Sequence, residues 1–276
     1  SGVTQFATGD RVIVVPMTGC DLCPACQRGQ VNYCRKMKLY GEHQDGTHCE
    51  YICIPQQSVM KLSNNITFTD AAAFPLVFVT AWHMLVTNGR VKQGDKVLVM
   101  GAASGVGSAA VQIAKLFGAE VIATAGSREK LAQAKQLGAD HVINHYKEDI
   151  ATTVRAMTSK RGVDLVIEHV GEKVWQDCLR SLGIGGRLIT CGATTGPVVS
   201  MDLRHVFIKQ QRIIGSTMGT LAELIEVHKH IAEGRLRPVV SRVFPYTAIK
   251  DAHRWLEGSG HFGKVVLDWG GAALSP

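Results

Sequence analysis

Apolar residues from position 94 onward fall into short runs that alternate with stretches of helical spacing. Residues 96–100 form the first run, and a second, β-branched run covers residues 121–124. Between them, apolar side chains recur three and four positions apart up to Phe117, which predicts a helix with one face packed on a sheet. The order strand, glycine turn, helix and strand is that of a unit that binds a dinucleotide.

The same alternation continues along the chain. Further helices are predicted over residues 130–137, 150–157, 174–182 and 221–233, and further strands over residues 141–144, 164–168, 186–190 and 212–216. Strands separated by helices of this length imply an α/β fold with a parallel, doubly wound sheet.

The two ends of the chain follow a different pattern. The first part predicts short strands over residues 10–15, 51–55 and 58–62, then a helical turn over 71–73 and a helix over 77–86. The last part predicts a strand near residues 239–244, a helix over 248–256 and a final strand over 264–267. Short strands and loops therefore lie on either side of the α/β part in the sequence.

The small-residue stretch after the first α/β strand has the chemistry of a phosphate-binding loop. Its candidate cofactor contacts are Gly101, Ser104, Gly105, Val106 and Gly107. Glycines permit positive φ and a close approach to a pyrophosphate, while free N–H groups at the start of the next helix face the anion. A tight turn without a ligand is the alternative, but the position between a strand and a helix favours a cofactor.

The end of the second strand favours NADP(H) over NAD. An acid there would bond the ribose 2′-hydroxyl of NAD, whereas small and basic residues accept the 2′-phosphate of NADP. Gly126, Ser127, Arg128 and Lys130 follow this strand, and the Ser127 hydroxyl and the two cations are candidate phosphate contacts. Alternatively, the cations form a solvated first helical turn and Glu129 serves a ribose.

Small residues also follow the later strands. Gly171, Gly192, Thr194 and Thr217 each lie shortly after a predicted strand. Ligands of an open parallel sheet sit outside the carboxyl ends of its strands, so these loops are predicted to hold the nicotinamide half of the cofactor.

Four cysteines near the start of the chain predict a metal site. Cys20, Cys23, Cys26 and Cys34 have the spacing C-x2-C-x2-C-x7-C, which lets four sulfurs converge on one tetrahedral zinc ion. The protein would fill every coordination position, so the zinc would be structural. Disulfides and an iron–sulfur cluster are the alternatives. The remaining thiols are expected to be buried, small apolar residues: Cys49, Cys53, Cys178 and Cys191.

Composition and charge limit the possible partners. The chain of 276 residues is 46% hydrophobic and 19% charged, which indicates a globular protein with one large or two medium domains. The net charge of +7 comes without a long Lys/Arg block, so we expect no nucleic-acid partner. The apolar stretch 71–86 is too short for a membrane span and no secretory signal opens the chain, so we expect a cytoplasmic protein. The start at Ser1 leads us to expect an incomplete N-terminus.

Several segments together resemble the medium-chain dehydrogenase/reductase superfamily, and within it NADP-dependent quinone oxidoreductases and zinc-binding alcohol dehydrogenases. These segments are residues 9–12, 20–34, 45–51, 101–107, 137–140, 185–188 and 262–267. The resemblance covers essentially the whole chain. It implies a GroES-like, mainly β catalytic domain from residues 1–77 and 218–276, a Rossmann domain from residues 78–217, and a homodimer or homotetramer.

The resemblance also assigns individual positions. Gly126 and Lys130 match positions that hold the 2′-phosphate in quinone oxidoreductases, and Thr80, Thr194 and Thr217 match positions near the nicotinamide. It shows two departures as well. Alcohol dehydrogenases place a cysteine or an acid shortly before the cofactor-domain helix, and they have an N-terminal section with further catalytic-zinc ligands. This chain has Leu76 at the first position, and the second feature does not occur in it. A leucine cannot ligate zinc, so we expect no catalytic zinc even in a longer parent chain.

We therefore expect NADP(H)-dependent hydride transfer to a quinone or an α,β-unsaturated carbonyl compound, with a structural zinc. Without a Lewis acid, the reaction would depend on orientation of the nicotinamide and on hydrogen bonds to the developing oxyanion. No general acid is identified, because His43, His48 and His83 are expected to be packed or surface histidines. The alternatives are a zinc-dependent alcohol dehydrogenase acting on an alcohol or aldehyde, and a non-catalytic NADPH-binding protein.

Overall fold

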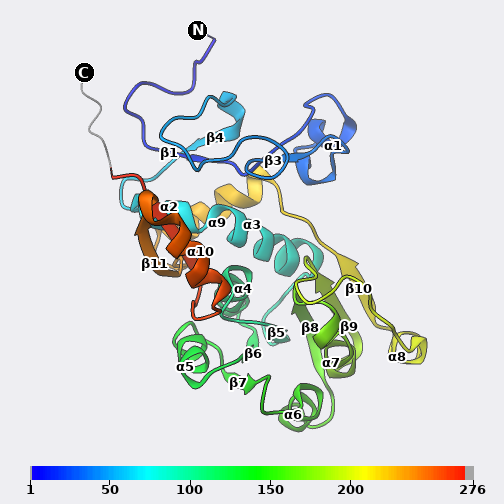
Figure 1. Cartoon of the computed structure of the whole chain (residues 1–276). Coiled ribbons are helices and arrows are strands. Elements are labelled where there is room, and N and C mark those ends of the chain that lie inside the picture. Colours follow the sequence, from blue (N-terminus) through cyan, green and yellow to red (C-terminus); the bar gives the residue numbers. More distant parts are fainter. Residues whose placement is uncertain (1, 271–276) are drawn as a thin grey trace. The chain divides into compact units, whose positions relative to one another are not determined.

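The computed structural model describes residues 2–270 and divides the chain into two compact units (Figure 1). Residues 80–218 form one unit. The chain before and after this segment forms the other, so the two ends of the sequence come together in one unit.

A six-stranded parallel sheet forms the centre of the unit 80–218. Its strands are β5 (Lys96–Val99), β6 (Glu120–Ala125), β7 (His141–Asn144), β8 (Val163–Glu168), β9 (Leu182–Thr190) and β10 (Arg212–Gly215). Their order in the sheet is β10-β9-β8-β5-β6-β7, and each neighbouring pair is parallel. This order reverses between β5 and β8, as in the dinucleotide-binding fold, and it confirms the predicted doubly wound sheet.

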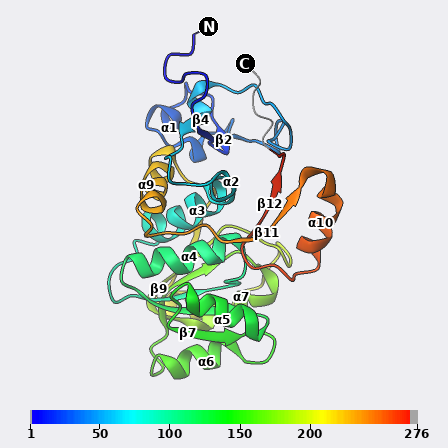
Figure 2. The ribbon, with the colours of Figure 1, turned by 90° about the vertical axis from the view of Figure 1, so that its left-hand side faces the viewer.

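Helices connect the strands of this sheet. They are α4 (Gly105–Leu116), α5 (Arg128–Gln136), α6 (Ile150–Met157), α7 (Trp175–Ser181) and the short α8 (Leu203–Ile208). The strand order runs one way from β5 to β7 and the other way from β8 to β10, so right-handed crossovers place α4 and α5 on one face and α7 on the other (Figure 2). Helices on both faces explain why the strands are continuous apolar runs.

The core of this unit comes from the strand runs and the inner faces of the helices. Leu98, Ile122 and Val166 are fully buried on adjacent strands, and Leu179 of α7 packs into the same cluster. The side chains of Ser104 and Ser127 cap α4 and α5 by accepting from main-chain N–H groups in the first turn. Each glycine loop therefore leads directly into a well-defined helix start.

The other unit contains short strand pairs and helices. Strand β1 (Val12–Val14) pairs antiparallel with β4 (Val59–Lys61), β2 (Met17–Thr18) pairs antiparallel with β3 (Lys38–Leu39), and β11 (Val240–Pro245) pairs parallel with β12 (Lys264–Asp268). Its helices include α1 (Pro24–Gln27), α2 (Phe68–Ala73), α9 (Leu221–Ala232) and α10 (Ile249–Glu257). Helix α3 (Pro75–Trp82) spans the boundary between the units along the sequence.

Two predicted elements are wrong in detail. Residues 51–55 form a loop, although their half-buried and exposed positions alternate as in a strand. Pro55 offers no N–H donor, and no strand in residues 2–270 pairs with this stretch. The helix predicted over 77–86 changes at Trp82 into a π-helix, His83–Asn88. There the Gly89 N–H donates to the carbonyl of Met84 at 2.8 Å, a close approach that glycine permits.

None of the helices within residues 2–270 is both long enough and apolar enough to cross a bilayer.

Candidate cofactor and metal sites

The carboxyl ends of the parallel strands bring most of the predicted cofactor residues to one edge of the sheet. Parallel strands all end at the same edge, so loops that are far apart in the sequence meet there. The predicted residues follow β5 (Gly101, Ser104, Gly105, Val106, Gly107), β6 (Gly126, Ser127, Arg128, Lys130), β8 (Gly171), β9 (Gly192, Thr194) and β10 (Thr217). Thr80 lies on α3, where its hydroxyl is buried 4.0 Å from the Met218 sulfur.

The loop after β5 has the shape of a phosphate cradle. Gly101 has a φ of +58°, which favours glycine, and its N–H donates to the Thr124 hydroxyl at 3.0 Å. A side chain at Gly107 would overlap the Gly101 carbonyl, so the loop and the first turn of α4 need glycine to pack this closely. Backbone N–H groups at a helix start with no side chains in the way suit an anionic pyrophosphate.

A fully buried carboxylate organises the next two strand ends. Glu168, the last residue of β8, accepts from the N–H groups of Val170 and Gly171 through Oε1, the latter at 2.6 Å. Its Oε2 accepts from the Thr190 hydroxyl at 2.8 Å. A buried charge of this kind is tolerated when its oxygens are fully hydrogen-bonded, and here the partners belong to the loop after β8 and to the last residue of β9. Glu168 thereby fixes the ends of β8 and β9 to each other.

His169 lies directly after Glu168 and against the glycine loop. Its Nε2 is 3.0 Å from the Ser104 hydroxyl, and its carbonyl accepts from the Thr194 hydroxyl at 3.1 Å. Burial lowers the pKa of His169, and the charge of Glu168 and nearby main-chain carbonyls oppose this effect. The ring is therefore neutral at pH 7.

A cation, an imidazole and a phenol gather around the end of β6. A side chain at Gly126 would lie 2.5 Å from the Tyr146 ring and 3.1 Å from Nε2 of His145, so both rings pack over this glycine. The two rings are 4.4 Å apart, centroid to centroid. Burial and then the charge of Lys130 lower the pKa of His145, so the charge of Lys130 lies near this imidazole. These donors suit a phosphate monoester.

The four predicted zinc ligands converge. The sulfur atoms of Cys20, Cys23, Cys26 and Cys34 all lie within 4.8 Å of one another, and this is the one such group of His, Cys, Asp and Glu found in residues 2–270. Tetrahedral zinc at Zn–S distances of about 2.3 Å holds its sulfurs about 3.8 Å apart, so the thiols fit the ion after a small contraction. Gly19 makes room for them, because a side chain there would lie 2.6 Å from the Cys26 sulfur.

The protonation of the cysteine lobe, residues 20–34, also fits a metal. The N–H groups of Leu22 and Cys23 lower the pKa of the Cys20 thiol to about 6. Burial and the neighbouring Cys23 raise the pKa of Cys26 to about 11 when no cation is present. Cys20 and Cys26 therefore differ in their affinity for a proton, and a shared cation would let both become thiolates.

The other four cysteines only partly follow expectation. Cys178 is buried and Cys191 is half-buried, whereas Cys49 and Cys53 are exposed. Their loop, residues 45–55, lacks a paired strand in the described chain, so it presents these side chains to solvent.

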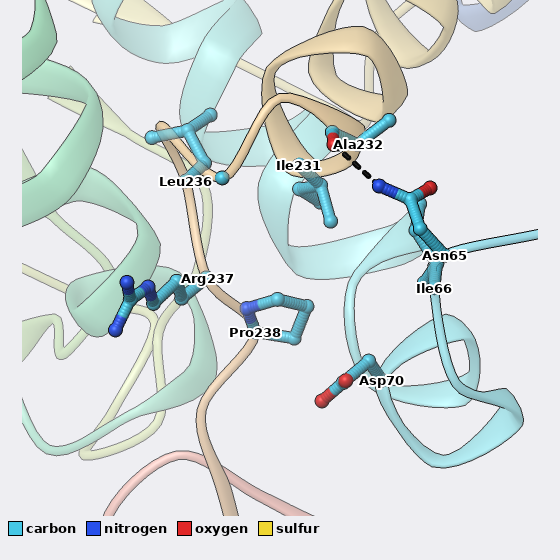
Figure 3. Close-up of a pocket in the computed structure, with 9 residues that line it drawn as sticks. Asn65, Ile66, Asp70, Ile231, Ala232, Leu236, Arg237 and Pro238 are labelled. Carbon is cyan, nitrogen blue, oxygen red and sulfur yellow. Dashed lines mark hydrogen bonds between the residues drawn. The ribbon is translucent and has the colours of Figure 1, made fainter. Parts of the chain in front are cut away.

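Two pockets lie in the unit formed by the chain ends. The first, of about 370 Å³, is closed on one side by the amide of Asn65, which donates to the Ala232 carbonyl at 2.7 Å (Figure 3). Asp70 in its wall already binds the Thr67 hydroxyl at 2.8 Å. The second, of about 520 Å³, is mostly apolar and is lined by residues that include Leu76 and Lys264.

The three histidines considered from the sequence lie in a turn, in the core and beside an aromatic ring. His43 accepts from the Leu39 N–H at 3.2 Å in a turn, and His83 is buried at the start of the π-helix. His48 lies 6.0 Å from the ring of Trp269 and lines the larger pocket.

Comparison with known proteins identifies the family. The model for the zinc-binding dehydrogenase family matches residues 105–233, and that for the alcohol dehydrogenase GroES-like domain matches residues 1–64. An acryloyl-coenzyme A reductase of Sulfurisphaera tokodaii is 30% identical over 96% of this chain and 78% of its own length. The chain belongs to the medium-chain dehydrogenase/reductase superfamily.

Other members of the superfamily are similar to this dehydrogenase/reductase. Human quinone oxidoreductase is 31% identical over 80% of this chain and 69% of its own length. A crystal structure titled as an NAD-dependent alcohol dehydrogenase has a TM-score of 0.94 and 43% identity, with 98% of this chain and 79% of that chain covered. The predicted Rossmann and GroES-like folds are thus confirmed, and the chain is an oxidoreductase of this superfamily.

Sequence reasoning missed four residues of this dehydrogenase/reductase that lie at the carboxyl ends of the parallel strands, here called the cofactor edge. They are Glu168, His169, His145 and Tyr146. A polar residue at the carboxyl end of an apolar strand was the available signal for the first two, and the polar sequence after Asn144 was the signal for the others.

We expect the Glu168→Gln variant to unfold more easily. The amide keeps one acceptor oxygen, so its NH2 group must either face the main-chain N–H groups or make the Thr190 hydroxyl an acceptor, and the remaining hydrogen bonds lose their charged partner. We expect about 1–3 kcal/mol of stability to be lost. Urea unfolding followed by circular dichroism measures this loss. The exposed neighbour Glu172 gives the matched control, and an equal effect of Glu172→Gln would contradict the role assigned to the buried carboxylate.

Proposed function

We propose that this protein is an NADP(H)-dependent oxidoreductase that transfers a hydride to a quinone or an α,β-unsaturated carbonyl compound, with a structural zinc in the cysteine lobe. The cofactor supplies the hydride. The unit 80–218 would bind and orient the cofactor at its sheet edge, and the unit formed by the chain ends has a pocket lined mainly by apolar residues that would suit the acceptor.

The observation that carries this proposal is the position of Leu76. Its side chain is 44% exposed and lines the 520 Å³ pocket, at the position where alcohol dehydrogenases have a cysteine or an acid. An aliphatic side chain cannot hold a metal that polarises a carbonyl. A conjugated acceptor needs such help least, because its conjugation spreads the negative charge that develops after hydride addition.

Lys264 adds a donor to this pocket. Burial lowers the pKa of its ammonium group, and the remaining lining is mainly aliphatic and aromatic. A hydrogen-bond donor in an apolar pocket stabilises a developing oxyanion more strongly than one in water. This surrounding suits an apolar acceptor with one carbonyl oxygen.

The names of two relatives support the same acceptor class. Acryloyl-coenzyme A and quinones both carry a carbonyl conjugated to a double bond, and both are named in enzymes about 30% identical to this chain. A zinc-dependent alcohol dehydrogenase is the second candidate, because the solved structure that is 43% identical is of an enzyme named NAD-dependent alcohol dehydrogenase. A non-catalytic NADPH-binding protein is a third.

Turnover with matched acceptors tests the function. We expect the full-length protein with NADPH to reduce a quinone or an enoyl thioester at least about tenfold faster than the saturated ketone of similar size, a difference of about 1.4 kcal/mol in the barrier. Absorbance of NADPH measures each rate. Reduction of the ketone alone, dependent on added zinc, would favour the alcohol dehydrogenase; cofactor binding without any turnover would favour the third candidate.

Two observations support NADP(H) as the cofactor. No acid stands at the tip of β6, where Gly126 and Ser127 follow Ala125. The donors around Gly126 then offer a positive charge, an imidazole and a phenol at the place where a ribose phosphate would lie. The alternative contact, Glu129, has its pKa lowered first by its own main-chain N–H and then by the Ser127 hydroxyl, so its carboxylate turns back onto the helix start.

We expect Lys130→Ala to weaken NADPH binding about tenfold or more and to leave NADH binding unchanged. A charge-assisted hydrogen bond contributes about 1.5–3 kcal/mol, and only NADPH carries the extra phosphate. Fluorescence titration gives both dissociation constants. Lys135, exposed on the last turn of the same helix, provides the control Lys135→Ala. Equal losses for both cofactors, or tighter binding of NADH by the native protein, would refute the assignment.

We expect one zinc per chain, lost in the Cys23→Ser variant. Four sulfurs complete the coordination of a structural zinc, and replacing one by a hydroxyl removes a thiolate ligand. Elemental analysis measures the zinc, and limited proteolysis reports whether residues 20–34 stay folded. The exposed thiol of Cys49 lies outside the cluster, so Cys49→Ser should keep the metal. Zinc retained by Cys23→Ser would contradict the proposed ligand set.

A further inference from the structure

We infer that His169 is a positioning residue of the cofactor site, which ties the phosphate-binding loop after β5 to the loop after β9. The side chain of His169 makes the first connection and its main chain makes the second. This inference rests on the proposed use of a nicotinamide cofactor, whose two halves would lie on these two loops.

The imidazole contacts the phosphate-binding loop at two points. Its Nε2 is 3.0 Å from the Ser104 hydroxyl, and the same oxygen accepts from the Gly107 N–H at 2.8 Å to cap α4. Its Cε1 would lie 3.1 Å from a side-chain carbon at Gly101, so the ring occupies the space beside that glycine. His169 thus supports both the first glycine of the loop and the hydroxyl that caps the helix.

The main chain of His169 contacts the loop after β9. Its carbonyl accepts from the Thr194 hydroxyl at 3.1 Å, and a side chain at Gly192 would lie 2.9 Å from the same oxygen. Gly192 and Thr194 therefore pack onto the residue whose ring supports Ser104. A shift of one loop moves the other. The loops that would bind the phosphate half and the nicotinamide half of the cofactor therefore keep a fixed position relative to each other.

The hydrogen bonds fit a neutral ring in which Nε2 accepts from the Ser104 hydroxyl. The Ser104 oxygen already accepts from the Gly107 N–H, so its hydroxyl proton is available for Nε2, and the single ring N–H is then at Nδ1. Among the described residues around the ring, Glu168 is the charged group that acts on it. The glycine loop after β5 and residues 192–194 after β9 contain no charged side chain.

A bound pyrophosphate would change the balance between the neutral and the protonated form of His169. Its negative charge next to the ring favours the imidazolium, so binding raises the pKa of His169. By linkage, the cofactor binds more tightly as the pH falls from 8 toward the pKa of the free protein. A residue that only packs the loop would not produce this dependence.

The test compares two variants of His169 by NADPH titration at several pH values. Valine removes the bond to Ser104, so we expect His169→Val to weaken binding about tenfold at pH 8. The amide of glutamine reaches the place of Nε2, so His169→Gln should bind NADPH nearly as well as the native protein at pH 8. It cannot titrate, however, and should lose the tightening at lower pH.

His141 supplies the matched control. This histidine lies on β7 of the same unit, where it is partly exposed and 3.3 Å from Glu120, and His141→Gln should leave both affinity and pH dependence unchanged. Histidine NMR gives a second readout, in which NADPH should move the pKa of His169 upward. Urea midpoints of each variant confirm that the proteins compared are folded.

The possible results separate this inference from the proposed function. If the native protein binds neither NADPH nor NADH, the proposed function fails and this inference fails with it. If the native protein binds NADPH but His169→Val has an unchanged dissociation constant, or His169→Gln keeps the native pH profile, only the role of His169 is refuted.

Discussion

The geometry of the candidate site depends on the buried carboxylate of Glu168. A carboxylate removed from water must be satisfied by donors, and here the donors are the N–H groups of Val170 and Gly171 and the hydroxyl of Thr190. The first two donors lie in the loop after β8, and the third is the last residue of β9. The hydrogen bonds of one carboxylate therefore link the loop after β8 to the end of β9. His169 and Thr194 meet within this frame. The sheet edge is therefore ordered by internal hydrogen bonds.

The α/β fold was predictable because its signals are local. Strands such as β5 and β8 are buried on both faces, so they appear as short apolar runs, and the intervening helices show a clear three- and four-residue spacing. The predictions were wrong where the hydrophobic pattern does not determine strand pairing or helix type. Residues 51–55 alternate like a strand but have no partner strand within the described chain. The π-helix that begins at His83 is too short for its apolar spacing to distinguish it from an α-helix.

The candidate site was predictable only in its local parts. Sequence proximity brings together the glycines of one loop and the four closely spaced cysteines, whose sulfurs lie within 4.8 Å of one another. His169 is distant from Ser104 in the sequence and reaches it because β8 pairs with β5. His145 and Tyr146 reach Gly126 because β7 pairs with β6. Such residues become visible only once the strand order is known.

The cysteine lobe and the cofactor edge achieve their order by different means. The lobe has only short elements, such as α1 and the turn at Val31–Tyr33, and of its four thiols only Cys34 is buried. So few buried apolar contacts cannot hold four sulfurs together against chain entropy, which makes a shared cation the natural source of order. The cofactor edge instead stands on a sheet whose central strands, β5 and β8, have mostly buried side chains. Its loops are positioned by the sheet, so the cofactor would meet a preformed surface, and more of its binding free energy would remain for orienting the nicotinamide.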